Sequence, residues 1–259
     1  MQKISKKSII KDRKFGQILG INVISADKSS VLASVKGFLS SSIKFAIVTP
    51  NPELILMAQK NEKLKEALNS ADLPVPDGVG LKLADSKLNI IKGRELFTDL
   101  IKLAEKENWK VFLLGGLSNE AELTAARLKK DNLGLRIDFF RGPVLDENAE
   151  PVTEVDKKIQ QDAIDKINKF TPEILFVAFG NPKQEIWAYK NLKKLNVGGV
   201  ASVGGSFRYA SGLSKLPPKW MEKAGLEWLY RLITEPKRIG RIFNAVILFP
   251  LTLLFQTKY

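Results

Sequence analysis

The chain has 259 residues, 44% of them hydrophobic and 27% charged, which is the composition of a globular protein with one large domain or two small ones. Cysteine and histidine are both absent, which excludes disulfides, thiolate chemistry, a histidine general base and the commonest metal ligand. The formal net charge of +13 indicates an anionic partner: nucleic acid, an acidic membrane surface or a phosphorylated substrate.

The first half of the chain alternates between strand-like and helix-like patterns. Residues 18–39 predict a short strand, paired as a hairpin, and then a helix. Phe45–Val48 predicts a buried strand, after which Asn51 is the expected N-cap and Pro52 the first residue of a helix that continues to Leu68. Because the free N–H groups at a helix start attract anions, this junction suggests a phosphate site at the end of a strand.

Asp77 lies in a proline-rich loop, Pro74-Val-Pro-Asp-Gly78, a short way after that helix. Without histidine, acid–base chemistry falls to Asp, Glu, Lys or Tyr. A carboxylate among prolines and a valine is in a partly apolar setting, which favours the raised pKa that a general base needs. The alternative is a turn residue, because Asp followed by Gly is a common turn pair. The residues alone leave both interpretations open.

The second half continues the alternation. Strands are predicted at 111–116, 135–139, 174–179 and 197–203, with helical patterns between them. Asn181 is the predicted cap of one of these helices, with Pro182 as its first residue. This alternation predicts an α/β fold with a Rossmann-like, mainly parallel sheet flanked by helices.

Polar or glycine-rich turns follow several of the predicted strands. In a parallel sheet, ligands bind in the crevice at the carboxyl ends of the strands. The residues expected to reach this crevice and bind substrate are Thr49, Asn51, Gly115, Gly116, Asn181, Gln184, Gly204 and Gly205.

The character of the chain changes at residue 215. We therefore predict an α/β core over 1–214 and a basic and apolar helical appendage over 215–259. A helix is expected over 220–233, and the apolar stretch 242–255 follows a group of arginines. No run of about 18 apolar residues occurs, so no full transmembrane span is predicted. Basic residues beside a shorter apolar stretch suit an interfacial membrane element. The alternative is a core or oligomer-interface helix.

Six stretches of the chain, in order, resemble the WecG/TagA/CpsF glycosyltransferases, bacterial enzymes that build surface polymers. Each stretch is a weak signal alone, and the six together are specific. They are Thr49-Pro-Asn-Pro-Glu53, Pro76-Asp-Gly78, Phe112-Leu-Leu-Gly-Gly116, Gly180-Asn-Pro-Lys-Gln-Glu185, Val203-Gly-Gly-Ser-Phe207 and Gly225-Leu-Glu-Trp-Leu-Tyr-Arg231. The resemblance covers roughly residues 15 to 245.

This resemblance implies an inverting transferase that needs no metal or other cofactor. Its donor would be a UDP-sugar, with N-acetylmannosamine as the expected sugar, and its acceptor a polyprenyl-diphosphate-linked sugar. The product would enter a cell-surface polysaccharide or teichoic acid. The protein would then lie in the cytoplasm, peripherally on the inner face of the bacterial membrane, whose anionic surface is a further expected partner. A homo-oligomer is compatible with this assignment.

The same resemblance implies roles for particular residues. Asp77 matches the catalytic base of the family. Thr49, Asn51 and Gln184 match positions that line the sugar and acceptor pocket. The arginines that match those closing over the diphosphate are Arg231, Arg238 and Arg241.

The chain departs from the family pattern at three positions. Ile90 stands where the family has an arginine, and Lys92 or Arg94 is the candidate replacement. Arg208 stands where an aspartate usually follows the phenylalanine, and Leu216 replaces another arginine. These changes bear on substrate choice more than on reaction class.

Two other classes of function are less well supported. A dinucleotide-dependent oxidoreductase would need G-x-G-x-x-G after a strand and an acidic residue about 20 positions later. Neither Gly115-Gly116 nor Gly204-Gly205 provides that pattern. A nucleic-acid-binding protein would fit the charge, but the basic residues are scattered and no binding motif is recognisable.

Overall fold

The computed structural model describes residues 5–11, 14–236 and 239–256. A six-stranded sheet in the order β4-β3-β8-β7-β5-β6 forms its centre, and every neighbouring pair of strands is parallel. The strands are β3 (Phe45–Val48), β4 (Leu73–Pro74), β5 (Lys110–Gly115), β6 (Arg136–Phe140), β7 (Ile174–Ala178) and β8 (Gly199–Ser202). The predicted α/β fold with a parallel sheet is confirmed.

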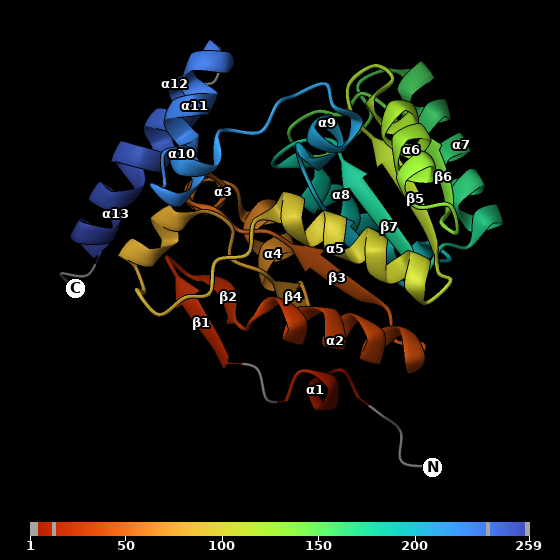
Figure 1. Cartoon of the computed structure of the whole chain (residues 1–259), viewed down its shortest axis with the longest axis horizontal. Coiled ribbons are helices and arrows are strands. Elements are labelled where there is room, and N and C mark those ends of the chain that lie inside the picture. Colours follow the sequence, from red (N-terminus) through yellow and green to blue (C-terminus); the bar gives the residue numbers. More distant parts are fainter. Residues whose placement is uncertain (1–4, 12–13, 237–238, 257–259) are drawn as a thin grey trace.

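Helices cover both faces of this sheet (Figure 1). One face packs against α2 (Lys28–Ser40), α5 (Gly93–Lys106), α6 (Glu120–Asp131) and α9 (Ser206–Ser211). The other face packs against α3 (Pro52–Ala58), α4 (Glu62–Asn69), α7 (Glu154–Phe170) and α8 (Lys183–Asn191). Three short helical pieces lie outside these layers: α1 (Lys6–Ile9), η1 (Val79–Leu83) and η2 (Leu192–Lys194).

The strands are apolar along their whole length because both of their faces are buried. In β7, Ile174 and Phe176 join one hydrophobic cluster, whereas Leu175 and Val177 join the cluster on the other side. Phe97 of α5 packs edge-on against Phe176, with the ring centroids 4.8 Å apart. Alternate side chains of each strand thus fill two cores, which is why continuous apolar runs identify such strands in a sequence.

Two of the predicted elements differ in detail. The expected hairpin is confirmed as β1 (Lys14–Ile18) and β2 (Ile21–Ser25), which pair antiparallel outside the main sheet. The single helix predicted from Pro52 to Leu68 is wrong, because the chain forms α3 and α4 with a break between them. Asn61 causes the break, since its side chain accepts a hydrogen bond from the N–H of Leu64 at 3.0 Å and starts a new helix.

The chain from residue 219 onward forms a group of helices beside α3 (Figure 1). They are α10 (Lys219–Lys223), α11 (Glu227–Thr234), α12 (Ile239–Phe243), the π-helical turn η4 (Asn244–Leu248) and α13 (Phe249–Gln256). The single helix predicted over 220–233 is wrong, because the chain turns at Gly225, whose φ of +71° favours glycine. Phe249 is fully buried and anchors the last helices in the core cluster that contains α3.

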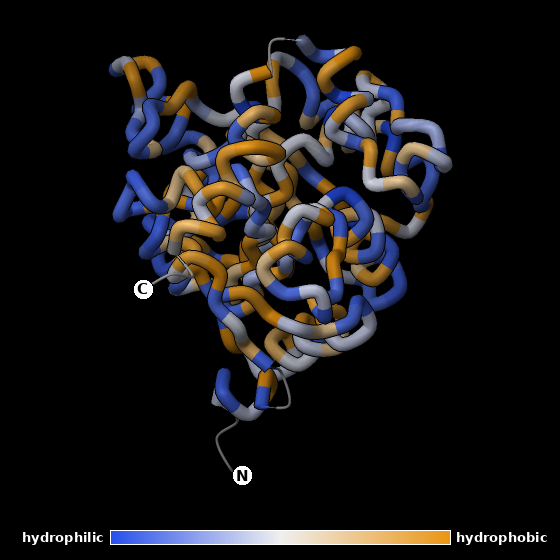
Figure 2. The backbone as a smooth tube through the Cα atoms, turned by 90° about the vertical axis from the view of Figure 1, so that its left-hand side faces the viewer, coloured by the Kyte–Doolittle hydropathy of each residue, from blue (hydrophilic) through white to orange (hydrophobic). Residues whose placement is uncertain are grey.

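The last helices also present apolar side chains to solvent. Ile239, Phe243, Leu254 and Phe255 are each more than half exposed. Figure 2 faces this side of the molecule and shows hydrophobic stretches running through it. In the described part of the chain, no helix combines the length and the hydrophobicity needed to cross a membrane.

Candidate active site

The predicted site residues follow neighbouring strands of the parallel sheet. Thr49 follows β3, Asp77 lies just beyond β4, and Gly204 lies just beyond β8. Gly180 follows β7, and Gly115 ends β5. Because all these strands point the same way, their carboxyl ends form one continuous edge from β4 to β5. We refer to this edge as the carboxyl edge.

Asp77 is held at the carboxyl edge by two other segments of the chain. Its backbone N–H donates to the carbonyl oxygen of Pro50 at 2.8 Å, and its carboxylate accepts a hydrogen bond from the backbone N–H of Gly93. A Cβ at position 93 would lie 3.2 Å from Oδ2 of Asp77 and 3.5 Å from Oγ1 of Thr49. Glycine therefore lets the start of α5 approach the carboxylate and the threonine closely.

The surroundings of Asp77 act on its pKa in both directions. Burial raises the pKa of this carboxyl above its ordinary value. The hydrogen bond from Gly93 and the positive charges of Arg231 and Arg94 lower the pKa again, whereas the negative charge of Glu227 raises it. The net pKa stays raised, although the residue as a whole remains partly exposed. A partly exposed carboxyl with a raised pKa is suited to accept a proton from a substrate.

Thr49 and Asn51 come directly after β3, near Asp77, and their side chains make different contacts. Thr49 is almost buried, with its hydroxyl close to the start of α5. Asn51 is the N-cap of α3, as predicted: its Oδ1 accepts a hydrogen bond from the N–H of Leu54 at 2.9 Å. At this helix start, where a phosphate site was suggested, Glu53 lies in the first turn and its carboxylate pairs with Arg241.

Gln184 connects two turns of the carboxyl edge. Its Oε1 accepts hydrogen bonds from the N–H groups of Gly180 and Gly204, both at 3.2 Å. Its Nε2 donates to Oδ1 of Asn181 at 3.0 Å and to Oε1 of Glu185 at 2.7 Å. These four bonds use the full hydrogen-bonding capacity of a primary amide. Gln184 therefore shapes the site by fixing the turns after β7 and β8.

The prediction that Asn181 caps a helix is wrong. Helix α8 begins at Lys183, Pro182 precedes it, and no side chain caps its first turn. The reason is that Oδ1 of Asn181 accepts a hydrogen bond from the side chain of Gln184 instead of from a backbone N–H. Asn181 still lies in the turn after β7, at the carboxyl edge.

Four of the glycines at the edge fall into two groups, and a Cβ at the fifth, Gly204, would lie 3.6 Å from Nε2 of Gln184. A Cβ at Gly115 would lie 3.0 Å from the carbonyl oxygen of Ala178, and one at Gly116 would lie 2.8 Å from Cβ of Glu120. Both have positive φ angles, so they close a tight turn that other residues cannot. By contrast, a Cβ added at Gly180 or Gly205 would meet no described atom within 4 Å. Open space therefore lies over the turns after β7 and β8.

The C-terminal arginines do not all reach Asp77. Arg231 lies with its guanidinium 5.8 Å from the ring centroid of Tyr209, near enough to Asp77 to lower the pKa of that carboxyl. Arg241 instead pairs with the carboxylate of Glu53 on α3. Arg238 lies outside the described residues. Of the described arginines with a predicted diphosphate role, Arg231 is thus the one placed beside the candidate base.

The three residues that depart from the family pattern lie in different surroundings. Ile90 packs partly buried against the hydrophobic core. Arg208 lies between two carboxylates, 3.3 Å from Glu120 and 3.6 Å from Glu235. Arg208 on α9 therefore connects the start of α6 with the end of α11. Leu216 is more than half exposed.

Glu185 is a polar residue that the sequence analysis did not single out. Its side chain is 1% exposed, and Oε2 is buried with no hydrogen-bond partner among the described residues. Burial raises the pKa of Glu185 to about 7. The sequence feature that could have indicated its burial is its place in the first turn of α8, directly before the apolar residues Ile186 and Trp187, which are buried.

Glu185→Gln is expected to raise the free energy of unfolding at about pH 8 by roughly 1–3 kcal/mol. The folded chain keeps the proton of Glu185 up to about pH 7, whereas an ordinary glutamate releases it near 4.5. Stability therefore falls as the pH rises through this window, and stays lower above it. Glutamine is neutral at every pH, so the fall should disappear.

Urea unfolding at about pH 5 and about pH 8 checks this expectation. The exposed glutamate of α6 offers a matched control, because Glu122→Gln should leave the pH dependence as it is. An unchanged pH dependence in Glu185→Gln would contradict the raised pKa.

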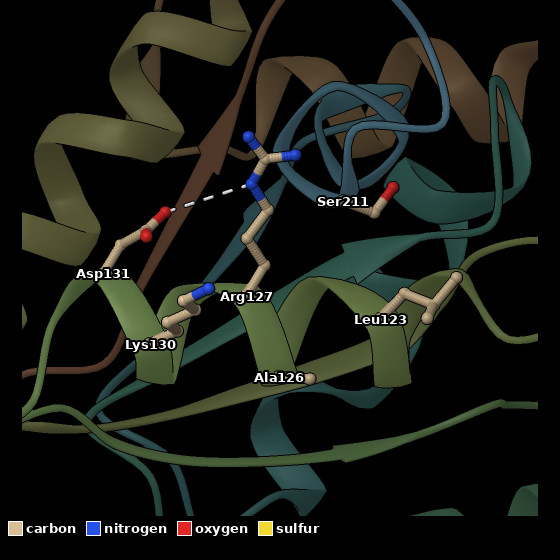
Figure 3. A pocket seen from close by; sticks show the side chains of 6 residues that line it. All are labelled: Leu123, Ala126, Arg127, Lys130, Asp131 and Ser211. Atoms are coloured by element: carbon tan, nitrogen blue, oxygen red, sulfur yellow. Dashed lines mark ion pairs between the residues drawn. The ribbon is translucent and has the colours of Figure 1, made fainter.

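A surface pocket lies away from the carboxyl edge (Figure 3). It is lined by Leu123, Ala126, Arg127, Lys130, Asp131 and Ser211. These residues come from α6, largely its C-terminal half, and from the last residue of α9. Arg127 lies 4.0 Å from Asp131 across one turn of the helix. The side chains that gather around Asp77 take no part in this pocket.

The described ranges hold no group of three or more Asp or Glu side chains arranged to bind a metal ion. At the carboxyl edge, the positive charges of Arg231 and Arg94 both lower the pKa of Asp77.

Comparison with known sequences identifies the family. The model of the glycosyl transferase WecG/TagA/CpsF family matches residues 16–259. An N-acetylglucosaminyldiphosphoundecaprenol N-acetyl-beta-D-mannosaminyltransferase from Bacillus spizizenii is 33% identical over 203 residues, which cover 76% of this chain and 74% of the relative. The enzyme of that name from Staphylococcus aureus is 29% identical over 237 residues, 89% of each chain. Because the similarity covers most of the chain and not only the motifs at the carboxyl edge, the chain belongs to the WecG/TagA/CpsF family and is a glycosyltransferase.

Proposed function

We propose that this glycosyltransferase moves N-acetylmannosamine from a UDP-linked donor to a polyprenyl-diphosphate-linked N-acetylglucosamine, in the synthesis of a cell-surface polymer. The names of the two relatives describe the transfer of N-acetylmannosamine to N-acetylglucosaminyldiphosphoundecaprenol. The observation that carries the proposal is the placement of Asp77, a partly exposed residue whose carboxyl has a raised pKa, at the carboxyl edge and within the electrostatic influence of Arg231.

Asp77 acts as the general base in this proposal. Its carboxylate takes the proton of the acceptor hydroxyl, and the hydroxyl oxygen then bonds to the anomeric carbon of the donor sugar. The bond from that carbon to the UDP oxygen breaks, and UDP leaves with the electron pair. A single displacement of this kind inverts the anomeric configuration. The bond from Gly93 N–H to the carboxylate and the open space over the turns after β7 and β8 support this placement of the reactants.

Arg231 is the group that meets the charge on the leaving diphosphate. A guanidinium keeps its charge at every working pH and presents paired donors that match phosphate oxygens. Positive groups already in place where negative charge develops can lower a reaction barrier by several kcal/mol. Arg241 is paired with Glu53 in this structure, so we assign the leaving-group role to Arg231 first.

A panel of UDP-sugars, assayed with a short-chain lipid-diphosphate N-acetylglucosamine acceptor, tests the proposed function. The expected result is a mass-detected product with UDP-N-acetylmannosamine that exceeds those of the other donors. Transfer from a different UDP-sugar would change the donor assignment. Transfer from none of them would contradict the proposed function.

The C-terminal helices are proposed to rest on the inner surface of the bacterial membrane. The acceptor carries a polyprenyl chain, which keeps it in the lipid phase. Apolar side chains such as Phe243 and Phe255 are exposed on these helices, and the chain carries a net charge of +13. Apolar contact combined with attraction to anionic lipid is the usual basis of interfacial binding.

Replacing both Phe243 and Phe255 by aspartate should weaken binding to anionic vesicles roughly tenfold or more, because two buried aromatic contacts are lost and two negative charges are added. Cosedimentation with vesicles that contain anionic lipid measures the effect. Leu133→Asp is the matched control, since Leu133 is 92% exposed on another part of the surface. Equal binding by the double variant and the wild-type chain would contradict the membrane assignment.

A further inference from the structure

Four charged side chains join the start of α5 to the helices α10 and α11. Arg94 donates from Nη1 to Oε2 of Glu227 at 2.8 Å and also pairs with Glu222. Lys92 pairs with Glu227, and its Nζ lies 3.9 Å from Oε1 of Glu222. We refer to these two bases and two acids, which together carry no net charge, as the anchor cluster.

The anchor cluster differs from an isolated surface ion pair. Its side chains are between 12% and 23% exposed, so much of each is removed from water. Each base contacts both acids, and Arg94 uses the two prongs of its guanidinium for the two carboxylates. Pairs in a partly dry network are screened less by salt than exposed pairs, and removing one member leaves its partners uncompensated.

The anchor cluster and the candidate base share one short segment of the chain. Gly93 lies between Lys92 and Arg94, and its N–H donates to the carboxylate of Asp77. The start of α5 therefore holds Asp77 with one backbone group, while the side chains on either side of it hold α10 and α11. A displacement of these helices from α5 is a displacement from Asp77.

Arg231 depends on the same contacts. Glu227 and Arg231 are four residues apart on α11, so they lie on one face of the helix. The guanidinium of Arg94 lies 5.9 Å from the ring centroid of Tyr209, and that of Arg231 lies 5.8 Å from the same centroid. Tyr209 on α9 thus gives both arginines a common aromatic surface, and the bond from Arg94 to Glu227 fixes the turn of helix that precedes Arg231.

We propose that Lys92 and Arg94 are positioning residues: through Glu222 and Glu227 they hold α11 in place, so that Arg231 faces the site of Asp77. The inference rests on the proposed function for the role of Arg231 in transfer. The anchoring itself is a property of the folded chain without substrate. Arg94 and Lys92 thereby act on Arg231 through other residues and need not touch the sugar or the diphosphate, while the charge of Arg94 separately lowers the pKa of Asp77.

A double-mutant cycle tests the anchor. Arg94→Ala, Glu227→Ala and the double variant are compared with the wild-type chain by hydrogen–deuterium exchange of residues 226–235. We expect each single variant to speed exchange there roughly tenfold, because partly buried charges lose their partner. The double variant should exchange more slowly than two independent effects would give, because the changes share the contact between Arg94 and Glu227 while each removes one further pair.

Kinetics of the same variants separate positioning from simple loss of structure. We expect kcat to fall roughly 10–100-fold, with a much smaller change in the KM of the donor, because a misplaced group acts mainly on the transition state. Arg94→Lys keeps the charge but loses the two-pronged contact, so it should give an intermediate kcat. Lys28→Ala breaks a 2.9 Å ion pair with Asp99 on the same helix α5 and should change neither measurement.

Additive effects in the cycle, or unchanged exchange at 226–235 in both single variants, would overturn the anchor. Hydrogen exchange needs no substrate, which separates this inference from the proposed function. Faster, non-additive exchange in a protein that transfers no sugar would count against the proposed function and leave the anchor supported.

Discussion

Asp77→Asn is expected to lower kcat for sugar transfer by roughly 10²–10⁴-fold, the usual contribution of a general base. Asparagine has nearly the same shape as aspartate and keeps an oxygen that can accept the hydrogen bond from Gly93. It cannot accept the proton of the acceptor hydroxyl. Burial disfavours the ionised form of Asp77, so the neutral variant should fold at least as stably at neutral pH. Release of UDP measures the rate, and thermal unfolding checks the fold.

The pH dependence of the reaction gives this expectation a second readout. The carboxylate is the active form, and the pKa of Asp77 is raised, so the wild-type rate should fall as the pH drops through a value above the ordinary range of aspartate. That acidic limb should be missing from the residual activity of Asp77→Asn. Asp85→Asn is the control, because Asp85 is an exposed turn residue that accepts a hydrogen bond from Lys87. Full turnover by Asp77→Asn would contradict the assignment of the base.

Arg231→Ala is expected to lower kcat by roughly 10²–10³-fold, the loss seen when one preorganised group that stabilises developing charge is removed. The negative charge that builds up on the departing UDP would lose the guanidinium to which we assign its stabilisation. Arg231→Lys should recover part of the rate, because it restores the charge without the paired donors. Single-turnover rates with saturating donor measure the effect on the chemical step.

Arg231→Ala should also shift the acidic limb of the pH–rate profile, the range in which the rate falls as the pH drops. The positive charge of Arg231 lowers the pKa of Asp77, so its removal should raise that pKa and shift the limb to higher pH. Arg127→Ala, which changes an arginine of the pocket in Figure 3, is the control and should leave both rate and limb unchanged. A normal rate and an unmoved limb in Arg231→Ala would contradict the placement of Arg231 beside the reacting groups.

Features of the fold that depend on nearby residues could be predicted from the sequence. The strand β7 is apolar on both faces because helices cover both, and its continuous apolar run predicts that burial. Asn51 caps α3 because its oxygen and the N–H of Leu54 are three residues apart, so the pattern contains both partners. Alternating strands and helices then predict a parallel sheet, and a parallel sheet brings the strand ends to one edge.

Features decided by distant residues could not be predicted in this way. Asn181 has the pattern of a helix cap, but its Oδ1 accepts a hydrogen bond from the side chain of Gln184. Gln184 in turn accepts a hydrogen bond from the N–H of Gly204, in the turn after β8. The contact of Arg94 with Glu227 joins residues 133 positions apart, and no local pattern indicates it. Lys92 and Arg94 appeared in the sequence as replacements for an arginine missing at Ile90, whereas the structure shows both bound to α10 and α11.

The stereochemistry of the product is the most direct test of the proposed mechanism, a single displacement at the anomeric carbon of the donor with Asp77 as the base. The purified protein is incubated with UDP-N-acetylmannosamine, in which the sugar is α-linked, and with a short-chain lipid-diphosphate N-acetylglucosamine, with a chelator present. The anomeric configuration of the new linkage is then determined by NMR. One base and one displacement predict a β-linked product that the wild-type chain forms roughly 10²–10⁴-fold faster than Asp77→Asn. An α-linked product, or a β-linked product formed equally well by Asp77→Asn, would contradict the mechanism.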